Sequence, residues 1–379
     1  MADDRYERNS QDLLNQAMAE VPFYKEHWSQ YDPGSACPAD ERYAALPVLT
    51  KSDMRASFPD GLVPYGTDVE QGLKDNQIEY TFTSGTTGDK VINLWNQDWW
   101  HASEMASWKL NSNLAKLSYL PRQATLASSL NVGISCEEDL PMDHRIMGNL
   151  LYLNEKANIM CWKAFHLERM AEELNTYRPT VLEANPSLLA RACRYWIRHG
   201  IHVYSPDVIT FTYELPSNVS LKVIRKVFDS PLVSSYGSTE TGFVMDTDEH
   251  GIYLQNTEYC RIDALPLKEE YGGPDLARLA VSTFHNPWAY IIRFDVGDLV
   301  KIEKNHTGSG IVALRIEGRA SNATFTTEGR LITTAMTDDA MCEIDSLADY
   351  DLTQTAANEY DVKLVLLDHE EDALKQADL

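Results

Sequence analysis

Apolar residues recur at helical spacing in the middle of the chain. The segment FHLERMAEELNTYRP, residues 165–179, predicts an amphipathic helix that Pro179 ends. Its apolar face consists of Leu167, Met170, Ala171 and Leu174. Asn185 and Pro186 form the cap and first-turn pair of the next helix, which continues as SLLARACRYW. Both segments therefore predict helices with one buried face.

Two further helices and several short strands follow from the same pattern. Asp98 is the predicted cap of a helix, and residues 216–228 form another with one apolar face. The apolar face of the first comprises Ala102, Met105, Ala106 and Leu110. Short apolar runs at 180–184, 208–211 and 231–235 lie between helices and predict strands. This alternation favours a mixed α/β fold of layered sheets and helices.

The composition indicates a globular chain longer than one typical domain. With 379 residues, we expect a main body and a smaller part. No apolar run approaches the roughly 18 residues that a membrane helix needs. The first residues, MADDRYERNS, lack the basic-then-apolar order of a secretory signal, so we expect a cytoplasmic protein.

The net charge disfavours some classes of binding partner. A formal charge of -24 at pH 7 repels nucleic acids and anionic membranes, so neither is an expected partner. An anionic ligand must then be held by local groups: backbone N–H groups, a metal ion or a few placed cations. The six cysteines contain no CxxC pair, which disfavours a zinc ribbon and a disulfide framework.

The segment YTFTSGTTGDK, residues 80–90, follows a strand-like run and gathers small polar residues around two glycines. Glycine lets successive backbone N–H groups point into one hollow, and hydroxyl groups add donors, so such a loop suits phosphate oxygens. Its residues of interest are Thr83, Ser84, Gly85, Thr86, Thr87, Gly88 and Lys90. The pattern does not satisfy the GxxxxGK[ST] motif of a Walker loop. Taken alone, it is also compatible with a polar hairpin turn.

Further motifs follow this loop in a fixed order: SSYGSTETG at 234–242, IIRFDVGDLV at 291–300 and EGR at 317–319. Together they resemble the adenylate-forming (ANL) superfamily of acyl-CoA synthetases, peptide-synthetase adenylation domains and luciferases. The stretches VPFYKEHW and LPVLTKSDMRASFPDGL near the start are similar to phenylacetate-CoA ligases. The resemblance implies a large adenylate-forming domain at 1–316 and a C-terminal lid domain, here shortened, at 319–379.

The resemblance also implies roles for individual residues. ATP and Mg²⁺ are the expected cofactors, with Glu240 holding the Mg²⁺ ion. The implied catalytic residues are Thr239, Glu240 and Arg319. The glycine-rich loop would hold the pyrophosphate, and the nucleotide would further contact Tyr236, Gly237, Ser238 and Asp298, the last at the ribose hydroxyls. Other interpretations stay open: Glu240 as a surface acid, Tyr236 as a core tyrosine and Asp298 as a turn cap.

The implied substrate pocket combines several segments. Its residues are Asn131, Val132, Gly133, Pro186, Tyr213, Glu214 and Tyr236. Relatives usually carry Gly or Ala where this chain has Tyr213, and an aromatic ring there could stack on a flat ligand. We therefore expect an aromatic or heteroaromatic acid. The alternative is that Tyr213 merely fills the pocket.

The C-terminal region departs most from the family pattern. Relatives continue for about a hundred residues after the hinge, whereas 320–379 provides 60 here, with Ser321 where aspartate is usual. Lys363 and Lys375 do not lie in the family's terminal lysine motif. The charge-rich end, 361–379, predicts a solvated helix. Short-lidded relatives occur in phenazine antibiotic biosynthesis, including that of D-alanylgriseoluteic acid.

Three functions are therefore compatible with the sequence. The first is an AMP-forming ligase that adenylates an aromatic acid, in the manner of phenazine pathways, and passes the acyl adenylate to a partner enzyme or another nucleophile. The second is an aryl-acid CoA ligase of phenylacetate-CoA ligase type, with CoA as acceptor. The third is a non-catalytic protein that binds an aromatic metabolite. A homodimer is an open alternative for the oligomeric state.

Overall fold

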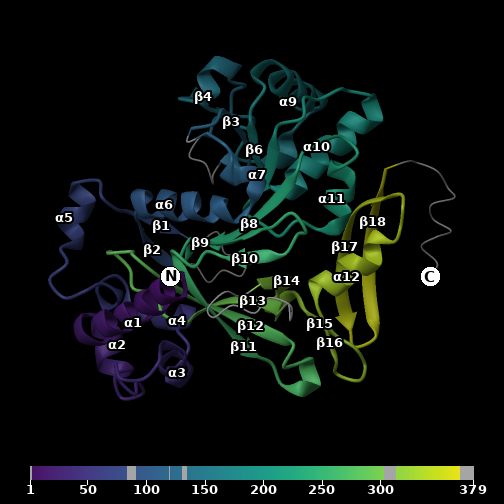
Figure 1. Ribbon diagram of the computed structural model, residues 1–379. Helices are drawn as coiled ribbons and strands as arrows, with labels where there is room; N and C mark the ends of the chain where they lie inside the picture. The colour runs from purple at the N-terminus through teal and green to yellow at the C-terminus, as the bar shows by residue number, and fades with distance from the viewer. Residues whose placement is uncertain (1, 83–90, 119, 130–134, 303–312, 368–379) are drawn as a thin grey trace. The chain divides into compact units, whose positions relative to one another are not determined.

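The computed structural model describes residues 2–82, 91–118, 120–129, 135–302 and 313–367 (Figure 1). The chain forms two compact units. Unit 1 consists of Met1–Asn111 and Ser235–Ser321, and unit 2 of Ser112–Ser234 and Asn322–Leu379. Each unit therefore combines two segments that are far apart in the sequence. The division into a large domain at 1–316 and a lid at 319–379 stays a prediction.

Unit 1 begins with a group of helices that share a core with its sheet. They are α1 (Ala2–Glu20), α2 (Pro22–His27), α3 (Ala39–Ala45), α4 (Lys51–Ser57) and α5 (Val69–Lys74). Helix α4 starts with a capping box, in which the side chains of Thr50 and Asp53 accept each other's backbone N–H groups. Buried helix residues such as Leu14 and Tyr24 join sheet residues such as Phe294 in one apolar cluster. Burial of this apolar surface stabilises unit 1.

The sheet of unit 1 is antiparallel, with the strand order β11-β12-β13-β14-β10-β9-β8. The bounds are β8 (Leu232–Ser238, in unit 1 from Ser235), β9 (Gly242–Thr247), β10 (Tyr253–Gln255), β11 (Cys260–Pro266), β12 (Leu276–Thr283), β13 (Phe294–Ile302) and β14 (Ala313–Arg319). A separate antiparallel hairpin joins β1 (Glu79–Phe82) to β2 (Ile92–Trp95).

Helix α6 (Gln97–Ser107) follows this hairpin and contacts β9. Its cap is Asn96, whose side chain accepts a hydrogen bond from the Trp99 backbone N–H at 2.7 Å. The prediction that Asp98 caps this helix is therefore wrong. Asp98 lies in the first turn instead, where a negative charge still interacts favourably with the helix N-terminus.

Unit 2 contains a mostly parallel sheet with the strand order β8-β7-β6-β3-β5-β4; among its described strands, only β4 runs antiparallel to its neighbour. Its other strands are β3 (Gln123–Leu126), β4 (Ile146–Met147), β5 (Leu150–Tyr152), β6 (Val181–Ala184) and β7 (Val208–Phe211). Its helices before residue 234 are α7 (Ser112–Ala115), α9 (Ala164–Tyr177), α10 (Pro186–His199) and α11 (Asn218–Ile224).

Most of the predicted elements of unit 2 are confirmed. The predicted helix face on α9 is buried, and the Asn185 side chain caps α10 by accepting from the Leu188 N–H at 3.0 Å. The three predicted strands correspond to β6, β7 and β8. The helix predicted at 216–228 is shorter and ends at Ile224. In the part of the chain that the structure describes, no helix is long and apolar enough to span a membrane.

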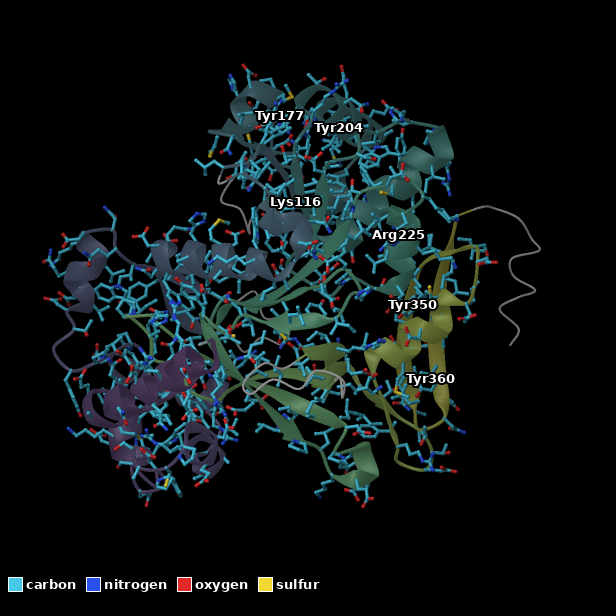
Figure 2. The ribbon with its side chains drawn as sticks, in the orientation of Figure 1. Lys116, Tyr177, Tyr204, Arg225, Tyr350 and Tyr360 are labelled. Atoms are coloured by element: carbon cyan, nitrogen blue, oxygen red, sulfur yellow. The ribbon has the colours of Figure 1, made fainter. Side chains whose placement is uncertain are left out.

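The C-terminal segment of unit 2 continues as short strands, one helix and a long hairpin. These are β15 (Thr324–Phe325), β16 (Leu331–Ile332), α12 (Thr334–Cys342), β17 (Leu347–Ala356) and β18 (Glu359–Leu366). Hydroxyl groups of Tyr350 and Tyr360, labelled in Figure 2, reach Asp338 at 3.4 Å and Thr324 at 3.2 Å. The helix predicted at 361–379 is wrong up to Leu366, where β18 forms; the tail 368–379 lies outside the described residues.

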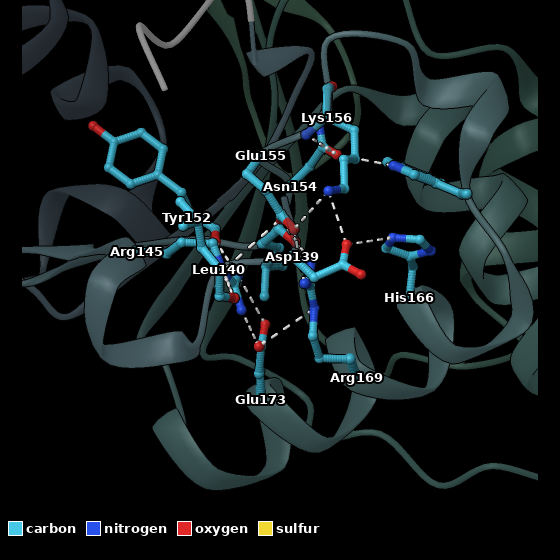
Figure 3. A network of polar contacts seen from close by, with 12 residues as sticks. Asp139, Leu140, Arg145, Tyr152, Asn154, Glu155, Lys156, His166, Arg169 and Glu173 are labelled. Carbon is cyan, nitrogen blue, oxygen red and sulfur yellow. Dashed lines mark hydrogen bonds and ion pairs between the residues drawn. The ribbon is translucent and has the colours of Figure 1, made fainter. Parts of the chain in front are cut away.

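A buried ion-pair network ties the end of β5 to α9 in unit 2 (Figure 3). Arg145 is fully buried and donates to both carboxylate oxygens of Glu173 and to the Tyr152 carbonyl. Arg169 pairs with the fully buried Glu155 at 2.7 Å. Burial raises the pKa of Glu173, and Arg145 only partly offsets that rise. A buried network of this kind is expensive to break, because removing one partner leaves an uncompensated charge.

We predict that Arg145→Met lowers the free energy of unfolding by about 3 kcal/mol, since Glu173 loses its closest cation while remaining buried. Urea unfolding followed by circular dichroism measures this. Arg198→Met, the same change on the exposed end of α10, should stay within about 0.5 kcal/mol of the parent. Equal losses in the two variants would contradict a special role for the network.

A second buried charge lies on β9 of unit 1. Asp246 has no exposed surface and accepts a hydrogen bond from the Ser107 hydroxyl at 3.1 Å. Burial raises its pKa to about 7, against a usual value of 3.8, although the hydroxyls of Ser235 and Ser107 work in the opposite direction. A carboxyl whose pKa is raised on folding stabilises the protonated folded state, and this contribution disappears as the pH rises through the folded pKa.

We therefore predict that the parent loses stability between about pH 4 and pH 7, by at most about 4 kcal/mol from this group. Asp246→Asn cannot ionise and should flatten that dependence. Unfolding free energies in urea at pH 5 and pH 8 test the prediction. The exposed change Asp12→Asn serves as the control and should retain the parental slope.

Candidate functional site

The YGSTETG motif forms the tight connection between β8 and β9. The Thr241 N–H donates to the Ser238 carbonyl at 3.1 Å, and the hydroxyls of these two residues lie 2.9 Å apart. Gly242 follows with φ +66, as in a type I turn closed by a left-handed residue. Thr239 and Glu240 lie within this turn, and Glu240 is only 7% exposed. Residue 240 is therefore not the surface acid that one interpretation of the sequence allowed.

The two glycines of the motif are required by close backbone approach. A Cβ atom on Gly237 would lie 2.3 Å from the Gly242 carbonyl oxygen. A Cβ on Gly242 would lie 2.8 Å from the Trp99 ring, in a backbone conformation that other residues rarely adopt. The register of β8 and β9 shifts between Tyr236 and Gly237. Glycine thus lets the strands pack where any side chain would separate them.

Three predicted site residues meet beside this turn and are termed the Tyr236–Asp298–Arg319 cluster. The Tyr236 hydroxyl donates to Asp298 Oδ2 at 2.5 Å, and Arg319 Nε lies 3.1 Å from Asp298 Oδ1. Arg319 also donates to the Val296 carbonyl at 2.5 Å. The residues come from β8, β13 and β14, where Asp298 and Arg319 are register partners. Side chains distant in the sequence are therefore fixed by the sheet itself.

The two charged side chains of the cluster differ in their exposure to solvent. Asp298 is 7% exposed, and burial raises its pKa, while Arg319 and the Tyr236 hydroxyl counteract that rise. The Arg319 side chain is 50% exposed and can meet an anion from solvent. Each carboxylate oxygen has two lone pairs, so Asp298 can still accept hydrogen bonds from a ligand's hydroxyl groups.

The predicted phosphate loop connects β1 and β2 of unit 1, whose last paired residues are Phe82 and Ile92. The strand expected before the loop is thus confirmed. The loop residues Thr83, Ser84, Gly85, Thr86, Thr87, Gly88 and Lys90 lie outside the described residues, as do the predicted pocket residues Asn131, Val132 and Gly133.

The Glu240 carboxylate at the turn is compatible with a Mg²⁺ ion whose other ligands are phosphate groups of a bound nucleotide and water. Within the described ranges, no group of three or more His, Cys, Asp or Glu side chains could hold a metal ion. Mg²⁺ commonly uses one or two protein carboxylates together with substrate phosphates and water. The single carboxylate of Glu240 fits that arrangement, and it does not fit an all-protein metal cage.

The remaining predicted pocket residues lie in unit 2 where β6 and β7 end. Pro186 is buried in the first turn of α10, and Glu214 accepts a hydrogen bond from the Ser187 N–H at 3.0 Å. Tyr213 adopts φ +76, which is unusual for a residue with a side chain. Tyr213 is 45% exposed, but its hydroxyl lies beside Glu183 and Thr125, and burial together with the Glu183 carboxylate raises its pKa. Glu183 was not predicted from the sequence.

Solved structures match the fold of the chain, although no protein-family model and no curated protein matches its sequence. A 2-hydroxyisobutyryl-CoA ligase in complex with 2-HIB-AMP is 15% identical over 99% of this chain and 81% of its own, with a TM-score of 0.72. An anthranilate-CoA ligase in complex with anthranoyl-AMP is 12% identical over 78% of this chain and 59% of its own, with a TM-score of 0.55. The predicted mixed α/β fold of adenylate-forming ligases is confirmed.

We predict that Tyr236→Phe lowers the free energy of unfolding by about 1–2 kcal/mol, because a buried carboxylate loses a hydroxyl donor. Tyr195→Phe is the matched control: it also removes a hydroxyl that donates to a carboxylate, Glu168, but at an exposed site. Its effect should stay below about 0.5 kcal/mol. Chemical denaturation compares the two, and indistinguishable losses would mean that the Tyr236–Asp298 bond is not formed.

Proposed function

We propose that this chain is an AMP-forming ligase of the adenylate-forming superfamily that activates an aromatic or heteroaromatic carboxylic acid with ATP. The observation that carries the proposal is the Tyr236–Asp298–Arg319 cluster beside the Glu240 turn. It supplies a flat ring, an acceptor for hydroxyl groups and a half-exposed cation on one rigid sheet. The fold supports the same function, since it is similar to that of ligases solved with acyl-AMP.

In the proposed reaction, a carboxylate oxygen of the acid forms a bond to the α-phosphorus of ATP while the bond to pyrophosphate breaks. Asp298 accepts the ribose hydroxyls, Tyr236 lies along the nucleotide and Arg319 faces the phosphates. Thr239 donates to the α-phosphate, and Ser238 with Gly237 lines the nucleotide. The 83–90 loop holds the leaving pyrophosphate. Mg²⁺, when bound through Glu240, supplies positive charge to the phosphates.

The acyl adenylate is proposed to pass to a partner enzyme or small nucleophile, as in short-lidded members from phenazine antibiotic pathways such as that of D-alanylgriseoluteic acid. Lys363, which lies outside the family's terminal lysine motif, pairs with Asp351 at 3.1 Å across the β17–β18 hairpin. Similarity to phenylacetate-CoA ligases, CoA as the acceptor, a homodimer and a cytoplasmic location remain predictions from the sequence.

Pyrophosphate exchange tests the proposal directly. Labelled pyrophosphate should enter ATP only when an aromatic acid is present, and Glu240→Gln should slow that exchange at least about tenfold, since it removes the carboxylate for Mg²⁺. Glu172→Gln, the same change on the exposed face of α9, is the control and should match the parent.

The outcomes separate the three functions. No label in ATP with any acid would identify a binding protein without adenylation activity. Thioester formation on adding CoA would identify a CoA ligase. Equal exchange rates in Glu240→Gln and the parent would remove Glu240 from the mechanism.

A further inference from the structure

Four residues in register across the parallel strands of unit 2 form a polar row: Tyr152, Thr125, Glu183 and Thr210. Thr125 on β3 is the register partner of Tyr152 on β5 and of Glu183 on β6, and Glu183 is the partner of Thr210 on β7. Register partners in a sheet point to the same face. The row therefore crosses one face of the sheet close to the carboxyl ends of the strands.

The opposite face has a different character. The alternating residues Leu151, Ala124, Leu182 and Ile209 have no exposed surface and belong to the apolar cluster shared with α9, α10 and α11. Parallel sheets usually carry apolar residues on both faces, since both are normally covered. The polar row departs from that rule next to the carboxyl strand ends, where ligands bind in open α/β sheets.

Glu183 lies at the centre of the row. Its Oε1 accepts a hydrogen bond from the Thr212 hydroxyl at 2.8 Å. No Lys, Arg or His forms an ion pair with Glu183 among the described residues. The phenols of Tyr152 and Tyr213 lie close enough to this carboxylate that, after burial, it is the next cause of their raised pKa values.

Two further observations describe the surroundings of Glu183. Thr125 is 3% exposed, and its hydroxyl lies, like the Glu183 carboxylate, beside the phenol of Tyr213, the residue with φ +76. Polar groups from β3, from β6 and from the end of β7 therefore converge at one place. Tyr152 is held by its carbonyl, which accepts from Arg145, while its ring points away from the ion-pair network (Figure 3).

We propose, resting on the proposed adenylation of an aromatic acid, that Glu183 selects acids that carry an N–H donor on their ring system. Glu183 accepts the N–H group, and the rings of Tyr152 and Tyr213 lie beside the ligand. A carboxylate oxygen has two lone pairs, so Glu183 can accept a ligand N–H group in addition to the Thr212 hydroxyl, and a methyl group of the same size cannot make that hydrogen bond. Sites built to hydrogen-bond a substrate group discriminate strongly against analogues that lack it.

The test compares 2-, 3- and 4-aminobenzoate with the corresponding methylbenzoates by calorimetric titration, in the presence of Mg²⁺ and a non-hydrolysable ATP analogue. At least one aminobenzoate should bind the parent at least about tenfold more tightly than its methyl counterpart. In Glu183→Leu, which has no hydrogen-bond acceptor, this ratio should fall to about twofold or less. The control Glu172→Leu, on the exposed face of α9, should keep the parental ratio.

A ratio near one in the parent, or an unchanged ratio in Glu183→Leu, would overturn the inference. If the variant does not fold, the affinity ratio measured with the parent protein still tests the inference. Pyrophosphate exchange separates this result from the wider proposal. Equal exchange with methylbenzoates and aminobenzoates would reject selection by Glu183 while adenylation stands, whereas selective binding without exchange would reject adenylation and leave the N–H selection supported.

Discussion

The carboxylate of Asp298 is the interaction on which the candidate site of unit 1 depends. A buried carboxylate is costly unless donors surround it, and here the donors come from different strands, Tyr236 on β8 and Arg319 on β14. The register of β13 with β14 places Arg319 directly opposite Asp298. A slip of one residue would turn the side chains of a strand to the other face and leave the charge unpaired. The site and the sheet register therefore stabilise each other.

The sheet of unit 2 divides its two faces between different tasks. One face carries the apolar cluster with α9, α10 and α11, which fixes the positions of the strands. The other face carries the polar row, in which Thr125 and Thr210 are buried. Rigidity from the first face lets the second keep Glu183 and Thr125 in place, because a side chain on a packed strand has few other conformations. In the proposed function, the apolar face thus provides stability and the polar face provides recognition.

The sequence was most informative where one short segment contains its own signal. The Asn185–Pro186 start of α10 and the apolar face of α9 follow from local spacing, and the structure brings Tyr236, Asp298 and Arg319 together as the motif resemblance suggests. Asn96 and Asp98 are both residue types that commonly cap helices. Only the structure, in which the Trp99 N–H donates to the Asn96 side chain, shows which of the two is the cap.

Other features depend on pairing between segments, which spacing does not encode. The alternation of Val362, Leu364 and Leu366 was a visible strand signal, but the charged residues after it resembled a solvated helix, and β18 forms because it pairs with β17. Glu183 interrupts an apolar strand, which is a visible signal as well. Its neighbours Tyr152 and Thr125 become apparent only once the strands are in register.

The C-terminal segment of unit 2 and Arg319 of unit 1 are each held in place by hydrogen bonds or an ion pair. Within unit 2 this segment is held by Asp338, which accepts from the Asn218 N–H at the start of α11, and by Lys222, which donates to the carbonyls of Cys342 and Ile344. In unit 1, Arg319 is fixed through Nε while half of its side chain stays exposed. A cation held in place loses little rotamer freedom when an anion binds, so Arg319 suits charge stabilisation in the proposed adenylation.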